Sequence, residues 1–247
     1  MATLMAQLYY PSEDLNLNIA RGLVKGTSHV HKFGAVPAMS TNTTGTIWDV
    51  NDTLYPWSAF ATPGVLTIPA VNAADDGDTV TVLGLDNNYD QIEETFTLSS
   101  SATVTGTKTF ARVYRAYYYD NTTNTGNINI QRGGTTVARI TAGKAQTLMA
   151  VYTIPAGYTG FLTQSTTSIQ YGGDATVDMF VRYFGQTSFR IGHTGEVAGT
   201  GMPYKYEFSV PIAIPEKSDI DVRTAVRSNN ARVTAAFDLI LIKNGLS

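Results

Sequence analysis

The chain has 247 residues, of which 43% are hydrophobic and only 15% charged, and its formal net charge at pH 7 is −3. This length allows one large β domain or two small ones. The low content of Lys and Arg argues against nucleic acid as a partner, because its phosphates are bound by clustered cations. With no cysteine, disulfides, thiolate metal sites and cysteine nucleophiles are excluded.

We expect neither a membrane segment nor a secretory signal. No stretch approaches the roughly 20 apolar residues that a membrane-spanning helix needs. The first residues lack the basic start followed by an apolar run that is typical of a signal peptide. The expected product is a soluble protein made in a cytoplasm.

The N-terminal part, residues 1–45, is predicted to be an extended arm. Leu15, Leu17 and Ile19 alternate with polar positions, which would also suit a short edge strand. A frayed terminus is the plain alternative. The predicted arm ends at residue 45 because residues 41–45 form a Thr- and Asn-rich loop, which separates it from the region that contains the two tryptophans.

Short apolar runs separated by Gly, Pro, Asn and Asp recur along the rest of the chain. They predict an all-β protein, an antiparallel β sandwich of the jelly-roll type, because no long segment shows helical periodicity with caps. The predicted strands are residues 65–68, 79–85, 91–98, 109–119, 127–131, 135–141, 147–154, 159–169, 175–184, 187–191, 204–212, 219–226 and 232–242.

The polar segment 120–126, with the sequence DNTTNTG, is the predicted domain boundary. It follows an aromatic strand abruptly and is rich in loop-forming residues. Beyond the arm, the chain is therefore divided into a small β domain of residues 46–125 and a jelly-roll-like sandwich of residues 126–247.

Five residues are candidates for a surface that binds another protein: Trp48, Trp57, Arg115, Tyr117 and Tyr119. The two tryptophans lie within ten positions of each other, and a local hydrophobic core is the alternative to a partner surface. The strand that carries the other three has Arg and aromatic residues on both faces. Such a composition favours an interface with another subunit or domain, although an exposed strand with ordinary Arg stems fits equally well.

Candidate metal ligands are few. His29 and His31 lie on the same side if their segment is a strand, but a third ligand is missing nearby, so a surface histidine pair is the main interpretation. The acidic segments 75–78 and 86–90 resemble cation-binding loops, yet neither has the spacing of an EF-hand, and ordinary acidic turns are the simpler interpretation. We predict no metal and no cofactor.

The chain is not expected to be an enzyme. Glu93 and Glu94 are adjacent, so they point to opposite faces of a strand, which is a poor arrangement for the two carboxylates of a glycosidase. His193 has no local acid or hydroxyl that marks it as a base. Nucleophile-elbow and phosphate-loop motifs are absent, and we predict no catalytic residue.

Four segments resemble a pattern found in virion structural proteins of tailed bacteriophages, especially those of aquatic bacteria. These segments are residues 83–98, 147–157, 214–220 and 237–242, and the resemblance spans roughly residues 46–244. They correspond to turns and core strands, so the resemblance implies a structural role and assigns no catalytic residue.

The resemblance implies a capsid decoration or cement protein that binds the major capsid protein and stabilises the head. Such a protein is located in the virion, is assembled in the host cytoplasm and is expected to be a homo-oligomer, with a trimer as the first expectation. The arm and the Trp48–Trp57 region would contact the capsid protein.

Two alternatives remain. The first is a tail or baseplate adaptor, or a fibre protein that binds host-surface glycans through Tyr117–Tyr119. The second is a glycan hydrolase on a jelly-roll scaffold, since a fold does not fix a function.

Overall fold

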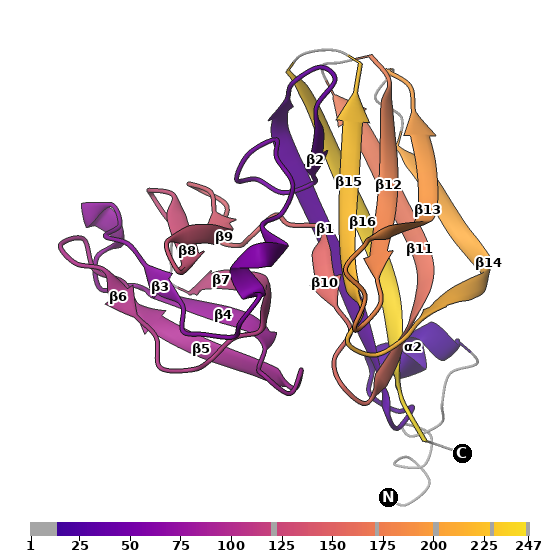
Figure 1. Ribbon diagram of the computed structural model, residues 1–247, viewed down its shortest axis with the longest axis horizontal. Helices are drawn as coiled ribbons and strands as arrows, with labels where there is room; N and C mark the ends of the chain where they lie inside the picture. Colours follow the sequence, from indigo (N-terminus) through magenta and orange to yellow (C-terminus); the bar gives the residue numbers. More distant parts are fainter. Residues whose placement is uncertain (1–13, 120–122, 171–172, 200–202, 228–229, 246–247) are drawn as a thin grey trace, which may run out of the picture.

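The computed structural model describes residues 14–119, 123–170, 173–199, 203–227 and 230–245. These residues form antiparallel strands with little helix (Figure 1), which confirms the all-β prediction. The helical elements in the described part are α2 (Leu15–Ala20), η1 (Trp57–Phe60) and η2 (Ala73–Asp75). None of the described helices has the length and apolar character needed to cross a lipid bilayer.

Eight strands form a two-sheet sandwich, on the right in Figure 1. One sheet has the order β1-β16-β11-β14 and the other β10-β15-β12-β13. Within this set the first strand pairs with the last, the second with the seventh, the third with the sixth and the fourth with the fifth, which is the winding of a jelly roll. Their bounds are β1 (Thr27–Met39), β10 (Val151–Thr153), β11 (Tyr158–Gln170), β12 (Ala175–Arg182), β13 (Arg190–Val197), β14 (Tyr204–Ile214), β15 (Asp219–Val226) and β16 (Ala231–Lys243).

The second strand of the jelly roll is split into two pieces. β2 (Thr44–Thr46) and β10 both pair with β15, one after the other along the same edge. Between them, the N–H of Ile47 donates to the carbonyl of Val222 at 2.8 Å, and the N–H of Val222 donates to the carbonyl of Ala150 at 3.1 Å. The chain therefore leaves the sandwich after Ile47 and returns to the same place at Ala150.

Residues 48–149 form a separate unit, which we call the insert. It contains a sheet of order β6-β3-β8-β9 and a three-stranded sheet of order β5-β4-β7. Their bounds are β3 (Thr67–Ile68), β4 (Thr79–Leu85), β5 (Gln91–Thr97), β6 (Val104–Thr105), β7 (Arg112–Tyr119), β8 (Ile128–Arg132) and β9 (Thr135–Ile140). The insert has its own buried core, in which Phe110, Ile128 and Ile130 are fully enclosed.

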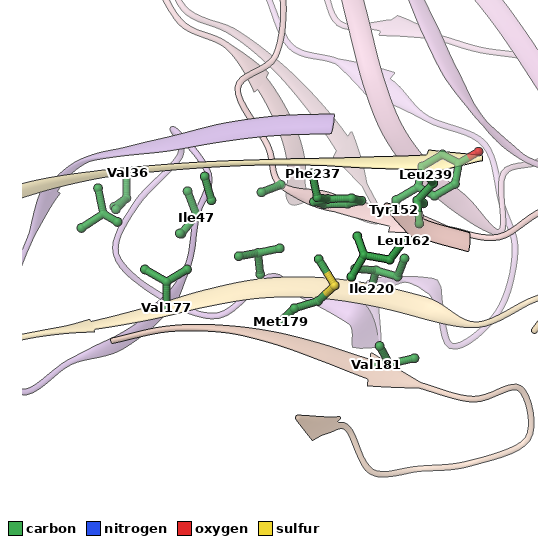
Figure 2. Close-up of a cluster of buried hydrophobic side chains, with 14 of the residues drawn as sticks. Val36, Ile47, Tyr152, Leu162, Val177, Met179, Val181, Ile220, Phe237 and Leu239 are labelled. Carbon is green, nitrogen blue, oxygen red and sulfur yellow. The ribbon is translucent and has the colours of Figure 1, made fainter. Parts of the chain in front are cut away.

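The sandwich core lies between the two sheets, as Figure 2 shows. β16 is central in its sheet, and Val233, Ala235, Phe237, Leu239 and Leu241 are all buried because alternate residues of a strand face the same side. From the opposite sheet they meet a second set of buried side chains: Val177, Met179, Val181, Ile220 and Val222.

The domain boundary lies elsewhere than at the predicted segment 120–126, whose residues 120–122 are outside the described residues. Asn124 is buried, and its side-chain amide donates to the carbonyls of Gly126 and Thr141 at 2.8 and 3.1 Å. Asp75 accepts hydrogen bonds from the backbone N–H groups of Thr125 and Gly126. Residues 124–126 are thus fixed inside the insert, and β8 and β9 belong to the insert instead of the sandwich.

The predicted arm is also revised where the structure describes it. β1 is a long strand of the sandwich, paired with β16 along its length. Leu15 and Leu17 lie on a short helix, because the side chain of Asp14 caps the N–H groups of Asn16 and Leu17 at 2.9 and 3.2 Å. Residues 1–13 of the predicted arm lie outside the described residues.

We call the place where the chain leaves the sandwich after Ile47 and returns at Ala150 the junction. Gly34 of β1 is expected to be essential there, because it lies directly against this backbone. A β-carbon at this position would lie 2.3 Å from the carbonyl oxygen of Ile47 and 2.5 Å from the amide nitrogen of Ala150. Because both atoms are backbone, Gly34→Ala should lower the free energy of unfolding by at least about 2 kcal/mol. Chemical denaturation measures this change.

Gly192→Ala is the matched control, since a methyl group there meets mainly the side chain of Val181 at 3.2 Å. Equal stability of Gly34→Ala and the unaltered protein would contradict the close approach of β1 to the junction.

Candidate partner surface and interdomain cleft

The five residues predicted to bind a partner occupy four different environments. Trp48 is only 2% exposed in the core of the insert, where its ring packs edge-on against Tyr55 at 5.2 Å, so it offers no surface to a partner. Trp57 lies at a cleft between the insert and the sandwich, and Arg115 and Tyr117 lie near β1. Tyr119 is 61% exposed.

Arg115 connects the insert to β1. Its Nη2 donates to the backbone carbonyl of His31, and its Nη1 donates to the hydroxyl of Tyr117 at 2.7 Å. The guanidinium also lies 5.6 Å from the ring centre of Phe33. The Arg-aromatic face of β7 therefore contacts the sandwich of the same chain, and we call this contact the seam.

Lys32 places a buried amino group at the seam. It is 2% exposed, and its Nζ donates to the carbonyl of Tyr114. Tyr114 lies at an irregularity of β7, between the pairs Leu83–Arg115 and Gly84–Val113, where the sheet ladder is disrupted and a carbonyl needs another partner. Burial, reinforced by the nearby positive charge of Arg115, holds the pKa of Lys32 well below its usual value.

Asp219 of β15 is a buried carboxylate shared by both parts of the chain. Arg112 of the insert donates to its two oxygens, from Nε at 2.7 Å and from Nη2 at 3.0 Å. Arg182 of β12 donates from Nη2 at 2.6 Å, and the hydroxyl of Thr153 donates at 2.7 Å. Burial opposes the charge of Arg112, but the hydrogen bonds and charge of Asp219 outweigh it and raise the pKa of Arg112.

Asp221, two residues further along β15, is the second buried carboxylate on the same face. The hydroxyl of Thr46 donates to its Oδ1 at 2.7 Å, and the indole N–H of Trp57 donates to its Oδ2 at 3.0 Å. Arg223 completes the set, with its Nε 2.9 Å from Oδ2. A strand with Asp, Asp and Arg at alternate positions is the sequence signal that could have located this network.

A cleft of about 560 Å³ opens beside this network, between the insert and the loop that joins β12 to β13. Its charged lining consists of Arg112, Arg182, Lys217 and Asp219. Its aromatic lining consists of Trp57, Phe60, Tyr89, Tyr183 and Phe184. We call this space the interdomain cleft; of its lining residues, Trp57 was predicted from the sequence as a partner-binding residue, and Tyr89 lies in the acidic segment 86–90.

The two histidines considered as metal ligands share one carboxylate. His29 Nε2 and His31 Nδ1 lie 3.1 and 2.6 Å from Oδ1 of Asp238 on the neighbouring strand β16. In the described part of the chain, no group of three or more His, Asp or Glu side chains is arranged to hold a metal ion.

The acidic segments have structural contacts. Asp75 binds backbone amides of the loop that precedes β8, and Asp76 accepts a hydrogen bond from the N–H of Ser100 at 2.5 Å. Asp86 accepts from the N–H groups of Asn88 and Asp90 at 2.8 and 3.0 Å. These carboxylates stabilise turns, as side-chain caps do.

The sandwich edge formed by β13 and β14 lies on the side away from the insert (Figure 1). Each of these strands ends its sheet, since β13 pairs only with β12 and β14 only with β11. Ile191 and Val210 are 57% and 79% exposed here, and Tyr206 is also exposed. We call this surface the open edge; the sequence analysis did not assign it, because a strand pattern does not tell which strands lie at the edges.

A bulge shapes the open edge. Residues 208–211 of β14 lie opposite the single residue Thr163 of β11, so Val210 is displaced outward. Pro211 lacks an N–H and does not support strand pairing. A cluster of rings from His193, Tyr206 and Phe208, with centres 4.8 to 4.9 Å apart, connects the two edge strands. At the bulge of β14, a partner would therefore meet exposed apolar side chains and not a regular row of backbone N–H and C=O groups ready for strand pairing.

Comparison with protein-family models and with curated proteins finds no match. Among solved structures, the chain is similar to a protein of the cowpea mosaic virus top component, described as naturally occurring empty particles. The identity is 8%, the TM-score is 0.23, and the alignment covers 74% of this chain and 83% of that one.

A chain of infectious bursal disease virus, Gx strain, is similar at 11% identity with a TM-score of 0.28, over 90% of this chain and 73% of that one. At such low identity and TM-score, neither likeness carries an inference about function.

Asp219→Asn is expected to destabilise the whole chain. It removes the negative charge that faces Arg112 and Arg182, and a buried cation left without its partner costs about 3–5 kcal/mol. The free energy of unfolding, measured by urea denaturation, should fall by this amount. Glu196→Gln on exposed β13 makes the same chemical change and should leave the midpoint unaltered. If Asp219→Asn and Glu196→Gln have the same free energy of unfolding, the hydrogen bonds and ion pairs of Asp219 do not hold the insert on the sandwich.

Lys32 is expected to make stability depend on pH. Its pKa is lower in the folded chain than the ordinary 10.5, so unfolding takes up a proton between these two values. The free energy of unfolding should therefore rise with pH in that interval, by up to about 1.4 kcal/mol per pH unit. Denaturation at several pH values from neutral to 10 measures the slope.

Lys32→Met should remove this part of the slope, whereas Lys205→Met on exposed β14 should retain it. If the free energy of unfolding changes with pH in the same way in the unaltered protein and in Lys32→Met, then Lys32 is not the source of the pH dependence.

Proposed function

We propose that this chain is a non-enzymatic structural protein of a virion, most specifically a capsid decoration or cement protein of a tailed bacteriophage that binds the major capsid protein. The observation that carries the proposal is the asymmetry of the sandwich. One side is covered by the chain's own insert, while the other presents exposed apolar side chains along two edge strands.

The jelly-roll fold is compatible with this role but does not by itself select it. Jelly rolls occur in capsid proteins, lectins and cupins, so function has to come from surfaces. The resemblance of residues 83–98, 147–157, 214–220 and 237–242 to phage virion proteins supports the virion among these choices. The low content of charged residues suits a shell protein that adheres by shape and apolar contact.

The open edge is the surface proposed to bind in the particle. Ile191 of β13 and Tyr206 and Val210 of β14 are exposed along this edge, and large exposed side chains of this kind are typical of protein interfaces. Because the bulge and Pro211 disfavour addition of a further strand, the partner is proposed to dock against side chains. A homo-trimer is the proposed oligomer, as the resemblance to phage virion proteins implies.

The second candidate is a tail or baseplate protein that binds glycans through Tyr117–Tyr119. The three tyrosines do not form one exposed platform: Tyr118 is 6% exposed, Tyr117 packs beside Arg115, and only Tyr119 is prominent at the surface. The glycan-hydrolase alternative would need two acids facing each other across a cleft. The interdomain cleft is lined by one acid, Asp219. A second cleft, beside α2, is lined by Glu207 and Asp238, and Asp238 is already engaged by His29 and His31.

The location in the particle is tested by fractionating virions of the virus that encodes the chain. The proposal expects the protein to copurify with intact heads at a copy number close to a multiple of the shell positions. Recovery only with isolated tails would contradict the head assignment and support the tail alternative.

Val210→Lys is expected to abolish attachment through the open edge. A charge at the most exposed apolar position of the edge should weaken binding to heads that lack the protein by at least about tenfold. Cosedimentation of purified protein with such heads measures the binding. Val65→Lys makes the same change on the insert, where the side chain is 38% exposed, and should bind normally. Equal binding by both variants would place the contact elsewhere.

A further inference from the structure

We propose that the interdomain cleft is a binding site for an acidic saccharide, that is, a sugar unit carrying a carboxylate. This inference is independent of the proposed role in the virion, because it rests on different residues and on a different side of the sandwich. It is argued from the charge, the aromatic rings and the backbone of the cleft.

The charges of the cleft favour an anion. Arg112, Arg182 and Lys217 line it together with one carboxylate, Asp219. Asp219 is engaged by both arginines, whereas Lys217 forms no ion pair among the described residues. The ammonium group of Lys217 instead lies 5.1 Å from the ring centre of Phe184 and 5.8 Å from that of Tyr89. The cleft therefore has an excess of positive charge that a carboxylate would neutralise.

Arg182 has donor capacity left for such a group. Its Nε and Nη2 both contact Oδ2 of Asp219, at 3.1 and 2.6 Å, which leaves Nη1 outside this pair. The guanidinium is held in place by stacking against Phe189 and Trp57, with centroid distances of 4.7 and 5.4 Å. A cation fixed in this way is preorganised for binding and loses little freedom when a ligand arrives.

The neutral lining favours a sugar over a simple ion. The cleft, at about 560 Å³, is in the size range of small-molecule sites, roughly 300–1,000 Å³. Phe184 and Tyr183 are 60% and 41% exposed at its rim, so flat apolar surfaces are available for the C–H face of a sugar ring. Gln186 and Thr187 add groups that hydrogen-bond to hydroxyls.

The backbone of the cleft is strained at two positions that face each other. Tyr89 has φ of 68° and Lys217 has φ of 59°, a left-handed conformation that bulky side chains adopt rarely. Both bring their side chains to the same cleft, where the ammonium group lies over the tyrosine ring. Strain of this kind is concentrated at ligand-binding sites, where surrounding contacts maintain it.

Isothermal titration calorimetry of the full chain with tri-galacturonate, and with the neutral galactose trisaccharide, tests the inference. At about 0.15 M salt, the acidic sugar should bind at least about tenfold more tightly than the neutral one. Lys217→Asn should weaken acidic-sugar binding by at least about tenfold, because it removes the charge while Asn tolerates the left-handed backbone. Phe184→Ala should also weaken it, through loss of the exposed ring.

Lys205→Asn is the matched control, since it makes the same charge change on exposed β14 and should bind like the unaltered protein. Thermal unfolding of each variant verifies that it is folded.

The inference is overturned by any of three results: no binding of the acidic sugar at about 10 mM, equal affinity for both sugars, or equal loss in Lys217→Asn and Lys205→Asn. Tighter binding of a tri-glutamate peptide or of a sulfated trisaccharide would also overturn it, by assigning the cleft to an acidic protein segment or to a sulfate ester.

Discussion

The structure depends on two carboxylates buried on the outer face of a sandwich strand. Asp219 and Asp221 would face solvent in an isolated jelly roll, yet they are 2% and 0% exposed because the insert covers them. Their charges are tolerated since Arg112, Trp57 and residues of neighbouring strands provide direct hydrogen bonds. Removing charges from water is costly unless they are paired in good geometry, so these contacts specify one position of the insert on the sandwich.

The position of the insert explains both surfaces discussed above. The insert leaves and re-enters through a split strand, and its β7 reaches β1 through Arg115 and Lys32. The insert therefore covers the side of the sandwich that contains β1 and β10. The two sheets can end in exposed strands only on the opposite side, which gives the open edge. Where the insert meets the β12–β13 loop, the arginines that neutralise Asp219 also line the interdomain cleft.

Local sequence patterns were sufficient for the strands with clear periodicity. The pair β8 and β9 was predicted from two short runs around Gly133 and Gly134, and both glycines adopt positive φ, as the turn requires. The strand predicted over residues 219–226 likewise agrees with β15 (Asp219–Val226). In each case the pattern that predicts the strand lies within about ten neighbouring residues, because the alternation of side chains and the choice of turn residues are local properties.

Features that depend on distant contacts were not predictable in this way. β1 has Lys32 in its middle, and this side chain is buried only because the bulged carbonyl of Tyr114, far along the chain, accepts its N–H. The segment 120–126 has the composition of a linker, but hydrogen bonds of Asp75 and buried Asn124 fix its residues 124–126 inside the insert. Of the residues predicted to bind a partner, Trp57 and Arg115 lie between the two parts of the chain, whereas Trp48 is in a core.

The amino-acid pattern alone establishes that this protein is all-β, where most strands begin and end, and that its composition has few charges, because period, turn residues and composition are local properties. The three-dimensional contacts are needed to show that the second strand is split, that buried acids hold the insert, and which edge stays open. Those features arise from pairing between distant residues, such as Thr46 and Asp221, which lie 175 positions apart, and no local pattern encodes which distant partner satisfies a buried charge or completes a sheet.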